Sequence, residues 1–206
     1  MDSIIFDLDG TLWDSRKTVS KAWTEVVKNA DDGQGEITEE DLKGTMGLQI
    51  PDIAKIVFNY LDETRQMEMI LECCRNERLY LVEEGAELYP RLEEVLQTLS
   101  KRYKLFIVSN CQEGYIEAFY EYHGLGGYFQ DFENPGRTGL SKGQNIQLII
   151  ERNQLSSPVY VGDTQGDQDA TTYAGIPFVY AAYGFGQVSD YDYKINQIED
   201  LLELFG

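Results

Sequence analysis

Basic residues are scarce in this chain. Its 206 residues include 17 lysines and arginines but 36 aspartates and glutamates, which gives a formal net charge of −19. Nucleic acids and anionic membrane surfaces attract proteins through basic side chains, so this balance disfavours both kinds of partner. A phosphorylated ligand would meet the same repulsion. A site for such a ligand must therefore contain a cation that reverses the field locally.

Cysteines and long apolar runs are scarce as well. The three cysteines, Cys73, Cys74 and Cys111, are too few and too irregularly spaced for a disulfide framework or a zinc site, which favours the reducing cytosol. No apolar stretch approaches the length of a membrane span, and the short run after Met1 does not have the basic start of a signal peptide. We therefore expect a cytoplasmic globular protein that is a monomer or a homodimer.

Short apolar runs recur along the chain, and helical patterns lie between most of them. This alternation predicts a parallel α/β sheet. Because the runs are apolar throughout and do not alternate with polar residues, helices should cover both faces of the sheet. The fold class that follows is α/β, with a Rossmann-like three-layer core. The runs span residues 3–8, 105–109, 159–162 and 176–181.

A long segment between the first two runs has no strand pattern. Residues 16–84 instead show apolar side chains at helical spacing in one stretch after another. Gly85 then punctuates the chain where it returns to the sheet. We therefore assign residues 1–14 and 86–206 to an α/β core domain and residues 15–85 to an inserted helical domain.

Two carboxylates stand at the end of the first apolar run. Asp7 and Asp9 lie two positions apart, directly before Gly10. Ligands of open α/β sheets bind beyond the carboxyl ends of the strands, so both acids should reach the ligand site. Carboxylates this close repel each other unless one is protonated or a cation lies between them, as in a nucleophile and an acid–base group beside a metal. The alternative is that both are ordinary turn residues.

A second acidic cluster follows the third run. Residues 162–167 read GDTQGD and contain Asp163 and Asp167. Acids delivered by two strand ends of one parallel sheet should converge, which predicts a metal site. The alternative is that Asp163 or Asp167 caps the following helix. One of them can cap the helix while the other binds a metal.

Polar residues complete a candidate phosphate site. Ser109 and Asn110 follow the second run, and Lys142 lies in the first turn of a helix for which Ser141 is a good N-cap. A hydroxyl, backbone N–H groups and a lysine together can bind a phosphoryl group. Taken separately, each is ordinary loop or surface composition.

The ordered motifs resemble the haloacid dehalogenase-like superfamily. They are DLDGT at 7–11, VSN at 108–110, Lys142 and GDTQGD at 162–167. The helical insertion is similar to the small cap domain of the branch that contains phosphoglycolate phosphatases and β-phosphoglucomutases. Gly143 departs from this branch, in which many members have proline after the lysine. The resemblance implies a Rossmann-like core with a parallel sheet and an inserted helical cap domain.

The resemblance also implies the covalent chemistry. Asp7 would attack phosphorus to form an aspartyl-phosphate, while Asp9 would protonate the leaving oxygen and then activate water. Ser109 and Lys142 would hold the transferring phosphoryl group. An acid at position 9 argues against dehalogenation, because the dehalogenases of this superfamily have none there.

Mg²⁺ is the cofactor that the resemblance implies. Its ligands would be Asp7, the backbone carbonyl of Asp9, and Asp163, with Asp167 holding a metal-bound water or Lys142. Carboxylates together with several waters are the usual environment of this ion.

The residues that contact the substrate are harder to predict. The segment 44–48, GTMGL, resembles the glycine-bearing cap loop that reaches the active site in relatives, so we expect Thr45 and Gln49 to contact the leaving group. Thr11 and Asn110 are the corresponding candidates in the core. An ordinary loop between helices explains the glycines equally well.

The function that we expect is a Mg²⁺-dependent phosphatase for a small phosphomonoester, either a phosphoglycolate-like acid or a sugar phosphate. The loop at 183–186, YGFG, is similar to one in phosphoglycolate phosphatases, although a simple glycine-rich turn is an equal alternative. Two other functions remain open. One is a phosphomutase that passes the phosphoryl group to a sugar, and the other is a non-catalytic protein that binds a phosphorylated ligand.

Overall fold

A six-stranded parallel sheet forms the centre of the computed structural model, which describes residues 1–206. Its strand order is β5-β4-β1-β6-β7-β8, and every neighbouring pair is parallel. The predicted α/β class is therefore confirmed. The strands are β1 (Ser3–Phe6), β4 (Lys104–Val108), β5 (Phe129–Glu133), β6 (Pro158–Gly162), β7 (Phe178–Ala181) and β8 (Tyr193–Ile195).

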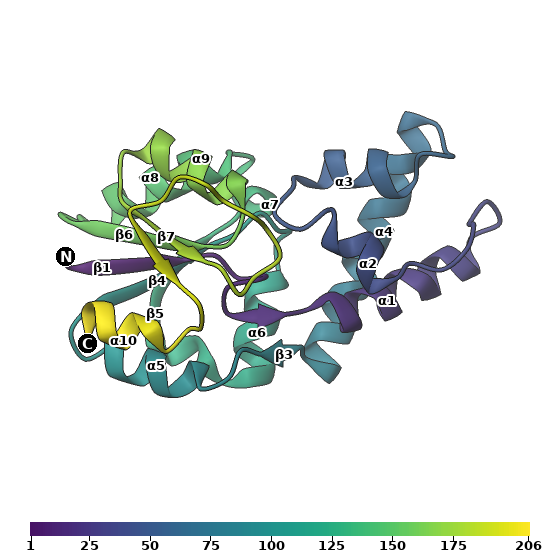
Figure 1. Cartoon of the computed structure of the whole chain (residues 1–206). Helices are drawn as coiled ribbons and strands as arrows, with labels where there is room; N and C mark the ends of the chain where they lie inside the picture. Colours follow the sequence, from purple (N-terminus) through teal and green to yellow (C-terminus); the bar gives the residue numbers. More distant parts are fainter.

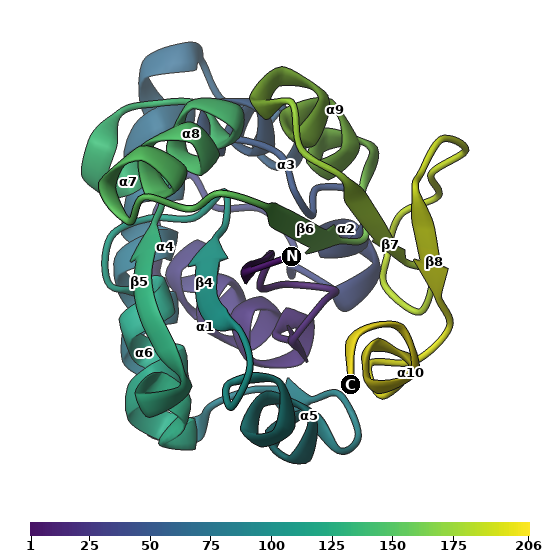
Figure 2. The ribbon, with the colours of Figure 1, turned by 90° about the vertical axis from the view of Figure 1, so that its left-hand side faces the viewer.

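Helices cover both faces of this sheet, as the uninterrupted apolar strands predict. In β1, Ile4 and Phe6 pack into one buried cluster and Ile5 into the other, because successive side chains of a strand point to opposite faces. Figure 2 shows α8 and α9 over one face and α5, α6 and α10 over the other. These helices are α5 (Leu92–Leu99), α6 (Tyr115–His123), α8 (Lys142–Arg152), α9 (Gln165–Ala174) and α10 (Asp200–Phe205).

Two outer strands have no counterpart in the sequence analysis. Strand β5 contains Gln130, Asp131 and Glu133, and much of it is only half-buried. Strand β8 is three residues long and mostly exposed. Edge strands are covered on fewer sides than central ones, so they do not need the apolar run that marks a buried strand.

Four helices form a separate group at one end of the molecule (Figure 1). Helix α1 packs along α4, and α3 also packs on α4. The predicted all-helical insertion is therefore present, although the boundaries at residues 15 and 85 stay a prediction. The helices are α1 (Arg16–Asn29), α2 (Glu39–Lys43), α3 (Ile50–Val57) and α4 (Glu63–Glu84).

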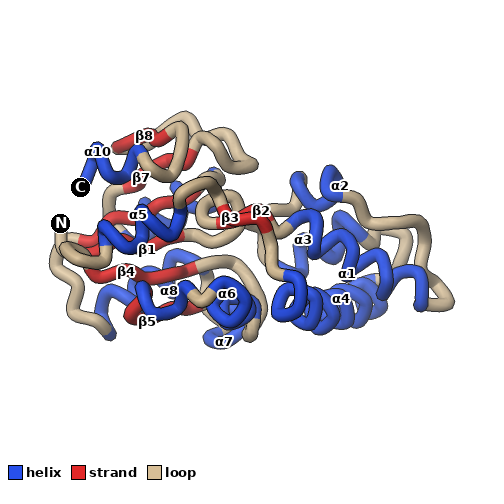
Figure 3. The backbone as a smooth tube through the Cα atoms, turned by 90° about the horizontal axis from the view of Figure 1, so that it is seen from below, coloured by secondary structure: helices blue, strands red, loops and turns tan.

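A small antiparallel ribbon connects the helical group to the sheet. It pairs β2 (Trp13–Asp14) with β3 (Glu87–Leu88), and Figure 3 shows it between the two parts of the molecule. The Trp13 ring is fully buried and meets the rings of Tyr115 and Phe119 edge-on, with centroid distances of 5.7 and 5.1 Å. Strands of two residues are too short to leave a pattern in the sequence.

The remaining elements are short. They are the 3₁₀ helix Leu125–Tyr128 and the helix α7 (Pro135–Thr138), both beside β5 in the chain. None of the helices combines the length and the apolar character that crossing a membrane requires.

Candidate active site

The predicted site residues lie where three central strands end. Asp7 directly follows β1, Ser109 directly follows β4, and Asp163 directly follows β6. All three side chains are buried. The backbone N–H of Asp7 still donates to the carbonyl of Val161 at 2.8 Å, which continues the β1–β6 pairing and fixes Asp7 beside the end of β6. Parallel pairing is thus what brings the motifs together.

Lys142 holds two of the carboxylates. Its Nζ donates to Oδ1 of Asp7 at 2.9 Å and to Oδ1 of Asp167 at 2.6 Å, and the lysine is only 4% exposed. Burial lowers the pKa of Lys142, but the two carboxylates outweigh this and raise its pKa above the usual value. The lysine therefore stays charged, and it is the local cation that a phosphate site requires.

One lysine does not neutralise the whole cluster. Asp7, Asp163 and Asp167 each place a carboxylate oxygen within 4.8 Å of the others. Burial raises the pKa of Asp7 to about 6, although Lys142 acts in the opposite direction. Burial, followed by the charges of Asp167 and Asp7, raises the pKa of Asp163 well above its ordinary value. The cluster therefore carries more negative charge than its surroundings compensate.

A divalent cation fits this donor set. Oδ1 of Asp163 is buried and has no hydrogen-bond partner in the protein, which is costly for a carboxylate oxygen. Hard divalent ions bind carboxylate oxygens, and such an ion would satisfy this oxygen and the excess charge together.

Asp167 has a double role. The N-cap of α9 is Thr164, whose side chain accepts from the N–H of Asp167. In return, Oδ2 of Asp167 accepts from the N–H groups of Asp163 and Thr164 at 3.1 and 2.9 Å. The capping alternative thus applies to Asp167 and not to Asp163, and the helix begins at Gln165. Capping leaves Oδ1 of Asp167 free for Lys142.

The glycine-rich loop after β7 packs on Asp163. The N–H of Phe185 donates to Oδ2 of Asp163 at 2.7 Å. A Cβ on Gly184 would lie 2.3 Å from Cβ of Asp163, and one on Gly10 would lie 2.3 Å from its Oδ2. Both glycines are therefore required for the close packing around this carboxylate. The loop is more than a simple turn.

Asp9 points away from the buried cluster. It is partly exposed, and its Oδ1 accepts hydrogen bonds from Oγ of Ser15 and, at 3.1 Å, from the hydroxyl of Tyr115. Burial raises the pKa of Asp9 to about 7, the charge of Asp7 adds to this, and the Ser15 and Tyr115 hydrogen bonds oppose it. A carboxyl with such a pKa can both give and take a proton near neutral pH.

Ser109 and Asn110 have different surroundings. The Ser109 side chain is buried and forms a hydrogen bond that lowers the pKa of Asp7. The side-chain amide of Asn110 donates to the carbonyl of Gly47 at 2.9 Å, and its Oδ1 is buried without a partner. Asn110 therefore ties the end of β4 to the loop between α2 and α3.

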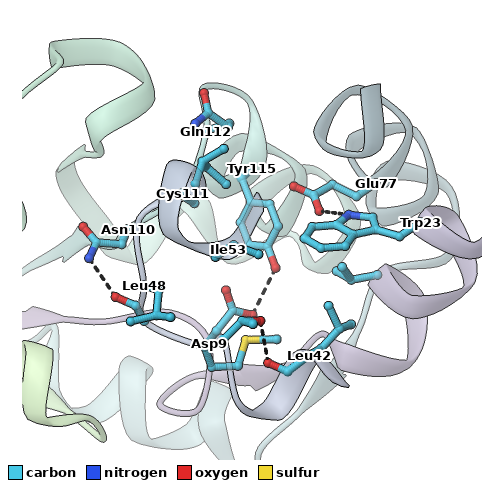
Figure 4. Close-up of a pocket in the computed structure, with 15 residues that line it drawn as sticks. Asp9, Trp23, Leu42, Leu48, Ile53, Glu77, Asn110, Cys111, Gln112 and Tyr115 are labelled. Carbon is cyan, nitrogen blue, oxygen red and sulfur yellow. Dashed lines mark hydrogen bonds between the residues drawn. The ribbon is translucent and has the colours of Figure 1, made fainter. Parts of the chain in front are cut away.

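A cavity of about 50 Å³ lies between this loop, α1, α4 and the core. Figure 4 shows Asp9 and Tyr115 on its core side and Trp23 and Glu77 on its helical side. The volume has room for only a few water molecules. An organic leaving group beside Asp9 would therefore require the helical group to open and close.

The four expected substrate contacts divide into two groups. Thr45 and Asn110 line the cavity, and the Thr45 hydroxyl donates to the carbonyl of Leu42 at 2.8 Å. Gln49 and Thr11 do not line it: Gln49 is exposed just before α3, and the Thr11 hydroxyl is buried without a partner. Substrate contact stays a prediction for all four.

Sequence reasoning missed several residues of the cavity. The motifs did not indicate Trp23, Tyr115 or Glu77, which line the cavity, or Ser15, which donates to Asp9. Only Glu77 left a clear signal. It lies on α4 at helical spacing from the buried Ile70 and Leu81, so a charged residue stands in an apolar stripe.

Comparison with known proteins defines the class. The model of the haloacid dehalogenase-like hydrolases matches residues 4–181, so the chain belongs to this family and the resemblance is confirmed. A phosphoglycolate phosphatase of Aquifex aeolicus is 27% identical over 211 residues, covering 99% of this chain and 96% of the relative. One of Synechococcus elongatus is 29% identical over 191 residues, covering 90% and 85%.

Solved structures agree with this fold. A haloacid dehalogenase-like family hydrolase from Streptococcus pneumoniae superposes with a TM-score of 0.82 at 23% identity, and the match covers 100% of this chain and 99% of the other. The core with its inserted helical cap is thus the architecture of the family. We call the helical group α1–α4 the cap from here on.

Proposed function

We propose that the chain is a Mg²⁺-dependent phosphatase that hydrolyses a small phosphomonoester through an aspartyl-phosphate on Asp7. The observation that carries this proposal is the buried cluster in which Lys142 contacts both Asp7 and Asp167 while an oxygen of Asp163 has no partner. Family membership and the phosphatase names of the relatives support the same class of enzyme, a phosphoric monoester hydrolase.

Three groups would hold the Mg²⁺ ion. They are the carboxylates of Asp7 and Asp163 and the backbone carbonyl of Asp9, while Asp167 would hold a bound water in addition to Lys142. When bound, the ion supplies positive charge that offsets the phosphoryl oxygens. This resolves the difficulty of binding a phosphate to a protein with a net charge of −19.

In the first step, a carboxylate oxygen of Asp7 forms a bond to phosphorus as the ester P–O bond breaks. The leaving oxygen takes the proton of Asp9, whose pKa of about 7 keeps a useful fraction protonated. Lys142 and Ser109 hold the phosphoryl oxygens during transfer. Asp7 is already oriented by Lys142, so little reorganisation is needed.

In the second step, Asp9 is a carboxylate and accepts a proton from water. The water oxygen bonds to phosphorus, the bond between phosphorus and Asp7 breaks, and inorganic phosphate leaves. Asp9 is protonated again and Asp7 is restored. The hydrogen bonds from Ser15 and Tyr115 keep Asp9 in place for both proton transfers.

The cap would close over the substrate during this sequence. Contact between Gly47 and Asn110 brings the cap loop against the core, and the cavity beside Asp9 is small when this contact is made. Closure excludes bulk water from the attack of Asp7. The substrate is therefore a small phosphorylated metabolite, with phosphoglycolate-like acids and sugar phosphates as the first candidates.

Phosphate release from a panel of esters tests the proposal. The panel contains 2-phosphoglycolate, O-phosphoethanolamine, sugar phosphates and nucleotides, each with Mg²⁺ and with EDTA. We expect release from at least one small monoester with Mg²⁺ and none with EDTA. Equal release in EDTA would contradict the metal requirement, and no release from any compound would contradict the phosphatase.

A further inference from the structure

The cavity beside Asp9 contains no basic side chain. Its lining includes two acids, Asp9 and Glu77, but neither a lysine nor an arginine. The nearby Arg75 and Arg78 line a different depression of the surface, which shares only Gln112 with this cavity. A leaving group that carries a carboxylate would therefore bring a negative charge beside two acids and find no cation to pair with it.

Glu77 is the unusual member of this lining. It is 4% exposed, and one carboxyl oxygen accepts a hydrogen bond from Nε1 of Trp23 at 2.5 Å. The thiol of Cys74, a weak donor, also forms a hydrogen bond with this carboxyl group. Figure 4 shows the oxygen that does not bond to Trp23 directed toward the side of the cavity where Tyr115 lies. Glu77 thus offers an acceptor to whatever occupies the cavity.

The other walls suit a cationic group. Trp23 and Tyr115 present aromatic rings, and Met46 adds a polarisable sulfur. Aromatic rings attract ammonium groups, and a carboxylate pairs with them directly. The remaining wall is mainly aliphatic and fits the carbon chain of a small alcohol. Burial raises the pKa of Glu77 to about 8, against the Trp23 hydrogen bond, so an ammonium beside it would favour its charged form.

We propose that Glu77 determines the leaving-group specificity of this enzyme by contacting an ammonium group, so that phosphate esters of small amino alcohols are preferred to esters of alcohols that carry a carboxylate. This inference rests on the proposed phosphatase function and, within the small phosphomonoesters, places amino-alcohol esters ahead of the phosphoglycolate-like acids. Asp9 would lie at the ester oxygen of such a substrate, and Glu77 at the amine. Esters of neutral alcohols should be hydrolysed with an intermediate preference.

Three esters with two-carbon leaving groups test the inference. They are 2-phosphoglycolate, 2-hydroxyethyl phosphate and O-phosphoethanolamine, in which the terminal group is negative, neutral and positive. We expect kcat/KM to increase in that order, with at least about a 10-fold difference between the extremes. The reverse order, or hydrolysis of other esters but none of these three, would overturn the inference and leave the phosphatase intact.

Glu77→Gln supplies the second readout. Glutamine keeps an acceptor for Trp23 but cannot become negative, so the ratio of kcat/KM for O-phosphoethanolamine to that for 2-phosphoglycolate should fall by about 10-fold or more. Glu72→Gln makes the same change at an exposed position of α4 and should leave the ratio unchanged. An unchanged ratio in a folded Glu77→Gln variant would overturn the inference.

Inhibition of the unmodified enzyme covers the case in which Glu77→Gln does not fold. Ethanolamine and glycolate are compared as competitors of 2-hydroxyethyl phosphate. We expect ethanolamine to inhibit at a concentration at least about 10-fold lower than glycolate. Equal or stronger inhibition by glycolate would overturn the inference. Failure of the whole ester panel with Mg²⁺ would instead remove the proposed function itself.

Discussion

At the scale of single residues, Asp163 combines a satisfied and an unsatisfied oxygen. Its Oδ2 is fixed by the N–H of Phe185, while its Oδ1 has no partner. The charges of Asp7 and Asp167 also raise its pKa, after the larger effect of burial. A bound cation would stabilise the folded protein through this oxygen, because it binds the folded state and not the unfolded chain.

Asp163→Asn should weaken Mg²⁺ binding by about 10-fold or more, because one charged ligand is lost from the set. We expect a smaller increase in Tm on adding Mg²⁺ than in the unmodified protein. In EDTA the variant should be at least as stable as the unmodified protein, since one buried negative charge is gone. Calorimetric titration with Mg²⁺ and thermal unfolding check both expectations.

Asp169→Asn is the matched control. Asp169 is exposed on α9, two residues after the end of the GDTQGD motif, and its side chain accepts a hydrogen bond from Gln165. Its replacement should leave the metal titration unchanged. If Asp163→Asn and Asp169→Asn gave the same Mg²⁺ affinity as the unmodified protein, Asp163 would not be a ligand.

The core of the candidate site could be predicted from the sequence, because strand ends are easy to locate. Asp7, Ser109 and Asp163 each follow an apolar run, and parallel pairing necessarily brings such positions to one edge of the sheet. Tyr115 and Glu77 could not be placed in the same way. Their positions depend on how α6 and α4 pack, which short-range patterns do not specify.

At the scale of elements, the cap loop between α2 and α3 makes the most specific contact with the core. Gly47 has a φ of +80°, and its carbonyl accepts from Asn110. A Cβ at this position would lie 3.0 Å from Oγ1 of Thr164, at the start of α9. A side chain at Gly47 would therefore strain the backbone and also press the cap away from the core.

Gly47→Ala should lower kcat/KM by about 10-fold, because closure of the cap is impaired. Steady-state kinetics with the best ester of the panel checks this. Gly35→Ala separates backbone strain from the contact with Thr164. Gly35 also has a positive φ, +75°, but a Cβ there would meet no atom within 4 Å. Both variants should lose roughly 1 kcal/mol of stability.

Only Gly47→Ala should lose activity. An equal loss of kcat/KM in Gly35→Ala and Gly47→Ala would mean that backbone strain alone is responsible and that the contact with Thr164 is unimportant.

Elements with a strong apolar pattern were predicted, and weakly patterned ones were not. The helix of Lys142 begins where its Ser141 cap predicts, and Ser141 and Gln144 form the complete reciprocal pair of hydrogen bonds of a capping box. The ribbon of β2 and β3 and the edge strands β5 and β8 escaped notice. They are held by pairing with distant segments, and little in their own composition indicates a strand.

At the scale of the whole molecule, the buried Glu77 should make stability depend on pH. Burial raises its pKa to about 8 from an ordinary value of 4.5. Below pH 4.5 both the folded and the unfolded chain hold this proton, and the contribution of Glu77 to the free energy of unfolding is fully present. Between about pH 4.5 and 8 the unfolded chain releases the proton and the folded chain keeps it, so this contribution is lost as the pH rises.

Glu77→Gln should remove this loss, because glutamine resembles the protonated acid. The free energy of unfolding of the variant should equal that of the unmodified protein near pH 4.5 and exceed it by roughly 2–4 kcal/mol near pH 8. Denaturant unfolding at several pH values measures this difference. The other carboxyl groups are the same in both proteins, so their effects cancel. If the free energies of unfolding of the two proteins changed with pH in parallel, the raised pKa of Glu77 would be contradicted.

The most direct test of the account concerns Asp7. Asp7→Asn removes the attacking carboxylate and keeps its size, so hydrolysis of the best ester with Mg²⁺ should fall by at least roughly 10³-fold while circular dichroism still reports a folded protein. Asp169→Asn should retain activity. Substantial turnover by folded Asp7→Asn would contradict the aspartyl-phosphate and, with it, the function proposed for this chain.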